Sequence, residues 1–217
     1  MAVTGAFLLA ACAASTPTPA PDDSAGAASP GTTSSAGEPS AADVGAASSL
    51  VSAVRLDSPD SLASIEGVRF TPAGSKAAAD LLASGASGDA LWAATYVYAS
   101  SGDSPEPLRA IATNTGASPS VRVMAAAGLL GRGDIAGFEP LIAALATSDP
   151  MDGMEPAGTT SEFAADVLER YAKAGFGPAL TASEDERAAS QAQWRAWLDA
   201  NRATLQFDPA SESWVTK

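Results

Sequence analysis

Residues 118–149, SPSVRVMAAAGLLGRGDIAGFEPLIAALATSD, decide the fold of this chain. Ser118 precedes Pro119, a pair typical of a helix start, and Gly131 and Gly133 favour a stop because glycine readily adopts left-handed backbone angles. Apolar residues recur at helical spacing in both halves of the stretch: Val121, Met124, Ala125, Gly128 and Leu129, then Phe138, Leu141, Ile142, Leu145 and Ala146. The pattern predicts two helices joined by a tight turn.

The first of these helices is apolar on a second face, formed by Val123, Ala127 and Leu130, so we expect helical neighbours on both of its sides. The stretch resembles a HEAT repeat of the short bacterial type. The resemblance lies in Pro119, Val121, Arg122, Ala125, Ala126, Leu129, Gly133, Asp134, Leu141 and Leu145. It implies an all-α fold, a short right-handed α-solenoid of helical hairpins.

A helical pair at 89–114 matches the pair at 120–147 at offsets of 31 to 33 residues, as Gly102 to Gly133 and Pro107 to Pro140 show. A looser third copy contains Phe163, Val167, Leu168 and Tyr171 and ends at Gly175. Recurrence at this period is typical of solenoids, in which each pair buries its apolar face against the next. We therefore expect about three HEAT-like repeats within residues 74–217.

Arg122 matches the arginine that links successive repeats in the HEAT family, but the position that often carries its aspartate partner is Ser118. The earlier repeat has Leu91 where Arg122 falls. We therefore expect packing, rather than a charge ladder, to join the repeats. Arg122 is interpreted as structural, with contact to a ligand as the alternative.

The composition limits the function. The formal net charge is −13, with 12 Lys and Arg against 25 Asp and Glu, so nucleic acid is a poor partner. Histidine is absent, which excludes imidazole bases and histidine metal sites, and a single cysteine excludes an internal disulfide. We expect no catalytic, cofactor-binding or metal-binding residues.

Residues 1–11 form an apolar run too short to cross a membrane, and Leu9-Ala10-Ala11-Cys12 resembles a bacterial lipobox. The resemblance implies a cleaved lipoprotein signal peptide and a lipidated Cys12 that anchors the protein to a membrane. The alternatives are a plain secretory signal with an incidental cysteine, or a buried apolar N-terminus. No Lys or Arg precedes the run, so we expect a basic segment upstream of Met1 in the native protein.

Residues 12–49 are almost entirely Ala, Ser, Thr, Pro and Gly, which predicts a disordered linker between the anchor and the folded domain. Residues 50–73 are interpreted as an initial segment, with a helix ending near Leu56, a short helix over 61–66, and Phe70 as an apolar plug on the first repeat.

The stretch 148–161 is polar and rich in glycine and proline, and we interpret it as a mobile acidic loop. Its carboxylates, Asp149, Asp152 and Glu155, do not follow the spacing of a calcium loop. An adaptable apolar contact through Met151 and Met154 is the alternative.

A last long helix is predicted to start at Ser183, with Glu186 completing a capping box. Trp194 and Trp197 lie on one face of it, and we expect them to close the core as an aromatic cap. The alternative is an aromatic platform for a sugar or peptide.

The expected function is a lipid-anchored, extracytoplasmic helical-repeat module that binds a protein or peptide partner as a scaffold. We expect it to be a monomer. A structural envelope lipoprotein without a specific ligand is the alternative. A carboxylate-based enzyme is the least favoured, because pairs such as Glu162 and Asp166 sit at ordinary surface spacing.

Overall fold

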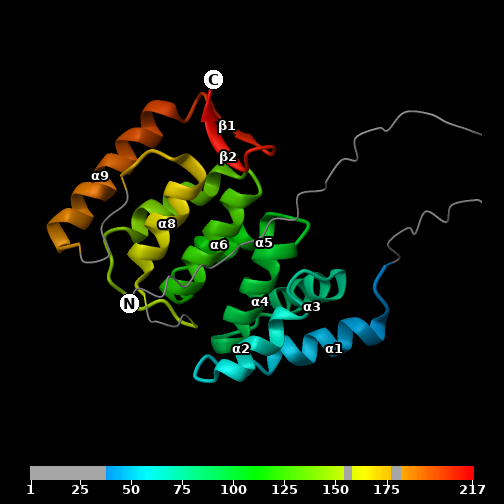
Figure 1. Cartoon of the computed structure of the whole chain (residues 1–217). Coiled ribbons are helices and arrows are strands. Elements are labelled where there is room, and N and C mark those ends of the chain that lie inside the picture. Colours follow the sequence, from blue (N-terminus) through cyan, green and yellow to red (C-terminus); the bar gives the residue numbers. More distant parts are fainter. Residues whose placement is uncertain (1–37, 154–157, 177–181) are drawn as a thin grey trace, which may run out of the picture.

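The computed structural model describes residues 38–153, 158–176 and 182–217. Within them the fold is mostly helical, as predicted, with one small β-hairpin near the C-terminus (Figure 1). The elements are α1 (Ala41–Ser52), α2 (Pro59–Glu66), α3 (Pro72–Ala83), α4 (Gly88–Ser101), α5 (Glu106–Ala112), α6 (Pro119–Gly131), the 3₁₀ turn η1 (Ile135–Gly137), α7 (Phe138–Ala144), α8 (Thr160–Ala172), α9 (Glu184–Asn201), β1 (Leu205–Asp208) and β2 (Ser213–Thr216).

Helix α6 occupies the centre of the molecule, and the predicted pair of helices in 118–149 is confirmed. The hydroxyl of Ser118 accepts a hydrogen bond from the backbone N–H of Val121, and Pro119 lies in the first turn. Helix α6 packs against α4, α5, α7 and α8, which explains why it is apolar on two faces. The same arrangement is visible in Figure 1, where α6 lies between α5 and α8.

Helix α1 corrects the prediction of a disordered linker that reaches residue 49. Ser40 caps the helix through its hydroxyl, and Ala47 and Val51 are fully buried. Helix α1 packs against α3 and α4, so its small side chains gain the tertiary contacts that composition alone does not reveal. Its alanines also favour a helix once those contacts exist.

The initial segment is confirmed in part. Helix α2 is capped by Ser58, but α1 ends at Ser52, and α3 begins at Pro72 rather than near Gly74. The prediction that Phe70 plugs the first repeat is wrong, because its side chain is 48% exposed. Ile65 fills the core in its place, at 1% exposure.

The described part of the 148–161 loop is folded onto the helices, so its interpretation as a mobile excursion is wrong there. The backbone N–H of Met151 donates to the carbonyl of Gly158 at 2.8 Å, and the Met151 side chain is buried. The hydroxyl of Ser120, itself fully buried, donates to the carboxylate of Asp152. Met154 and Glu155 lie outside the described residues.

The β-hairpin corrects the expectation of a purely helical cap. Strands β1 and β2 pair antiparallel, with Leu205 opposite Thr216 and Phe207 opposite Trp214. The hairpin lies over the C-terminal end of α6 and beside α8. Its aromatic side chains join the same core cluster as the helices.

Candidate functional site

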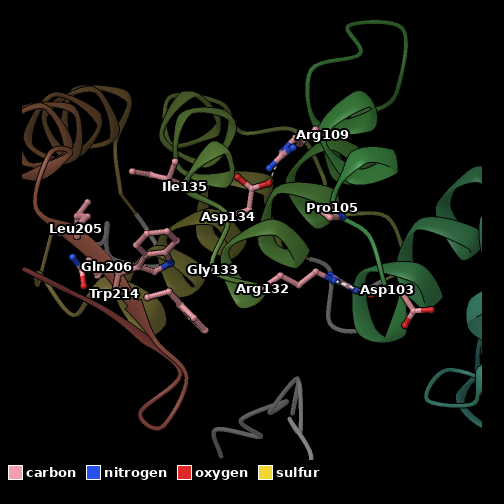
Figure 2. Close-up of a pocket in the computed structure, with 12 residues that line it drawn as sticks. Asp103, Pro105, Arg109, Arg132, Gly133, Asp134, Ile135, Leu205, Gln206 and Trp214 are labelled. Carbon is pink, nitrogen blue, oxygen red and sulfur yellow. Dashed lines mark hydrogen bonds and ion pairs between the residues drawn. The ribbon is translucent and has the colours of Figure 1, made fainter.

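A groove of about 770 Å³ lies where two helix turns meet the β-hairpin (Figure 2). One wall is the α4–α5 turn, the floor is the α6–η1 turn, and the other wall is the hairpin. The lining residues are Gly102, Asp103, Pro105, Arg109, Arg132, Gly133, Asp134, Ile135, Leu205, Gln206, Phe207 and Trp214. Segments that are distant in sequence therefore form one surface.

Arg132 ties the floor of the groove to the wall formed by the α4–α5 turn. Its guanidinium donates to the carbonyls of Tyr98 at 2.6 Å, Ala99 at 2.9 Å and Gly102 at 3.1 Å, and to that of Gly128 at 2.8 Å. The last carbonyls of a helix lack partners within the helix and carry partial negative charge. A guanidinium at this position therefore caps α4 and joins it to α6. Burial lowers the pKa of Arg132, but an arginine stays charged in proteins.

Arg109 and Asp134 form an ion pair between α5 and the α6–η1 turn, visible in Figure 2, with Nε and Oδ2 2.5 Å apart. The second guanidinium edge of Arg109 lies 3.4 Å from Glu106. The hydrogen bond that Arg109 donates to Asp134 raises the pKa of Arg109. Asp134 also accepts from the backbone N–H of Ala136 and thereby caps η1, so this charge pair is fixed in position.

The hairpin wall is held by aromatic packing. The indole N–H of Trp214 donates to the carbonyl of Leu130 at 3.3 Å. Phe207 packs so closely on Gly133 that a side chain there would meet it, since a Cβ would lie 2.9 Å from Phe207 Cβ. Gly133 also has a φ of +74°, an angle that glycine adopts without strain. The turn and the hairpin therefore fit only with glycine at this position.

The groove combines apolar side chains with fixed charges and open backbone. Ile135 and Phe207 are partly exposed and supply apolar area, Trp214 lies buried behind them, and Gln206 is exposed. Asp103 is exposed and has no ion pair within the described part of the chain. No group of three or more potential metal ligands occurs among the described residues.

A second hollow of about 220 Å³ lies beside Glu66, Trp92 and Tyr96. The Tyr96 hydroxyl donates to one carboxylate oxygen of Glu66 at 2.5 Å, and Arg69 binds the other at 3.4 Å. Burial, followed by the hydrogen bond to Glu66, raises the pKa of Tyr96. Both oxygens of the glutamate are thus engaged, and the hollow is below the usual size of a ligand pocket.

The residues singled out from the sequence lie elsewhere. Trp194 is fully buried and packs edge-on against Trp197, with centroids 5.6 Å apart, so it presents no platform to a ligand. Trp197 is partly buried and contacts Phe138. Arg122 is half-buried, and its Nε has no hydrogen-bond partner in the described structure. Cys12 and residues 1–11 lie outside the described residues.

Sequence reasoning missed the residues that shape the groove. The sequence marks Gly133 only as a helix stop, and Gly133 with Asp134 as part of the repeat pattern. It does not single out Arg132. The recurrence of Gly-Asp at 102–103 and 133–134 is the signal that points to this end of the helices, because both turns line the groove.

Comparison of the chain with known protein-family models, with curated proteins and with solved structures found no match. Within the described residues, every helix is too short or too polar to cross a membrane.

Proposed function

We propose that this protein is a lipid-anchored, extracytoplasmic module whose helical repeats hold a groove for a peptide or protein partner. The observation that carries the proposal is the groove itself, which two successive helix turns and the C-terminal hairpin build together. Its mixture of exposed polar groups and aromatic side chains is that of a protein-binding surface.

The order of helix packing supports a short solenoid of three pairs. Helices α3 and α4, α5 and α6, and α7 and α8 pack as neighbours, a pairing shifted by one helix from the pairs expected at 89–114 and 120–147. Helices α4, α6 and α8 also pack in sequence against one another. Solenoids place equivalent helices in one row in this way. Arg132, at the C-terminal end of α6, reaches back to α4, and Arg109 of α5 pairs with Asp134 in the next turn. Packing and these contacts then take the place of the regular charge ladder of the HEAT family.

The membrane anchor is proposed from the sequence at Cys12 alone. Metabolic labelling with a palmitate analogue tests it. Label on the chain that disappears in Cys12→Ser is the expected result. Label that persists in this variant, or a wild-type chain that takes up none, would contradict the anchor without touching the groove.

The groove is tested by site-specific photocrosslinking in the native host. A photoreactive amino acid at Gln206, in the groove, is compared with one at Lys76, an exposed residue of α3 away from it. A defined adduct from position 206 and none from position 76 is expected. Two outcomes would contradict the proposal: no adduct from either position, or equal adducts from both. The chain would then be better described as a structural lipoprotein without a specific ligand.

A further inference from the structure

Strand β1 has an edge that faces the groove. Leu205, Gln206 and Phe207 are consecutive, yet all three line the groove. Side chains of a strand alternate between its two faces, so three consecutive residues reach one cavity only when the strand presents its edge to it. Strand β2 packs beside α8, which leaves the opposite edge, that of β1, toward the α4–α5 turn.

The hydrogen-bond register shows which backbone groups lie on this edge. The N–H of Lys217 donates to the carbonyl of Thr204 at 3.2 Å, so these two residues form a hydrogen-bonded pair. Bonded and non-bonded pairs alternate in an antiparallel ladder. Leu205 and Phe207, opposite Thr216 and Trp214, therefore direct their N–H and C=O groups away from β2. Within the described residues nothing bonds to these outward groups.

We propose, building on the function above, that an extended basic segment of a partner protein adds to the free edge of β1 as a third strand. Such strand addition obtains affinity from main-chain hydrogen bonds and specificity from alternate side chains. Every second side chain of the added strand lies over Ile135 and beside Phe207, so apolar residues fit those positions.

The space between the walls of the groove fits a single added strand better than the hairpin of a second copy of this chain. Edge-to-edge pairing of two hairpins requires open space beyond the edge. Here Pro105 and Arg109 face β1 across the groove, and a folded partner sheet would meet them (Figure 2). An added strand needs only the strand spacing of about 4.8 Å.

The negative charge around the groove favours a basic partner segment. Arg109 is paired with Asp134 and Glu106, whereas Arg132 keeps its positive charge near Asp103, so the groove and its rim hold three carboxylates against two guanidiniums. Asp103 remains exposed and without an ion pair among the described residues, and the whole chain carries a net charge of −13. A lysine or arginine of the added strand therefore pairs with Asp103, while the overall field favours its approach.

The test has two steps. Peptides that bind the full chain are first selected from a display library of short random peptides. Amide hydrogen exchange of the protein is then measured with and without a saturating concentration of a selected peptide. Exchange at Leu205 and Phe207 should slow about ten-fold or more, because their N–H groups become bonded. Exchange at Gln206 and Asp208 should not change, because the ladder already bonds these residues to β2.

Charge is tested with Asp103→Asn and a matched control, Asp199→Asn, which makes the same charge change on an exposed position of α9. Asp103→Asn should weaken binding about three-fold, and the control should not. Peptides that bind without slowing exchange at Leu205 and Phe207 would overturn strand addition and leave a peptide-binding groove standing. Failure to select any peptide would overturn both proposals, and equal effects of the two variants would overturn the basic partner.

Discussion

Replacing Arg132 by alanine should destabilise the fold by about 3 kcal/mol. Its guanidinium donates four hydrogen bonds. The carbonyl of Tyr98 also accepts from the backbone N–H of Gly102, so the loss falls mainly on the other three carbonyls, those of Ala99, Gly102 and Gly128. Hydrogen bonds to charged groups contribute about 1.5–3 kcal/mol each, but the groove is open to water, which re-solvates part of what is lost. Counting about 1 kcal/mol for each of these three carbonyls gives the expected loss of about 3 kcal/mol.

Urea unfolding followed by circular dichroism measures this loss, with Arg195→Ala on an exposed turn of α9 as the control. A cost of about 3 kcal/mol corresponds to a fall in Tm of roughly 6–12 °C for a domain of this size. Arg132→Lys should recover only part of the stability, because a lysine cannot reproduce the planar fork. If Arg132→Ala costs no more than the control, Arg132 does not join α4 to α6.

Three further predictions concern the core and the last helix. Gly128→Ala should destabilise the protein although alanine favours helices, because the new Cβ would lie 2.8 Å from Ala99 Cβ. Gly45→Ala is the matched control: a Cβ there would meet no atom within 4 Å, so this variant should be more stable by up to about 1 kcal/mol in the same urea titration. Trp194→Ala should cost about 3–5 kcal/mol by thermal unfolding, since the side chain is fully buried, and a surface-like cost below about 0.5 kcal/mol would contradict its place in the core. The backbone amide of Ser183 lowers the pKa of Glu186 below 4.5, so the stability advantage over Glu186→Gln should be present above pH 4.5 and fade as the pH falls through the lowered pKa; an advantage that grows on acidification would reverse the sign.

Helices with clear periodicity and caps could be predicted from the sequence. The capping box of Ser183 and Glu186 is present, and α6 begins after Ser118 as its Ser-Pro pair indicates. Most of helix α1, residues 41–49, could not be predicted, because an alanine- and serine-rich segment folds only through the contacts it makes with α3. Strands β1 and β2 have four residues each, too few for an alternating pattern to emerge.

The candidate site was less predictable than the fold because its residues meet only after packing. Arg132 lies within a turn in the sequence, and nothing local indicates that its guanidinium reaches the end of α4. Asp134 is notable in the sequence only as part of the repeat pattern. In the structure it caps η1, and its ion pair with Arg109 joins positions 25 residues apart. Local sequence patterns therefore predict where a turn lies. Which charged side chains line a groove depends on which turns lie next to one another after packing.

The aromatic cluster determines what optical probes report about this protein. Trp197 and Trp214 contact Phe138, and Trp194 packs against Trp197, whereas Trp92 stacks on Tyr96. Indole emission is therefore weighted toward the C-terminal end of the molecule, and Trp92, which lies beside α2, supplies the signal from the N-terminal helices. Two indoles in edge-on contact also couple their electronic transitions, which adds a signal to the far-ultraviolet dichroism from which helix content is read.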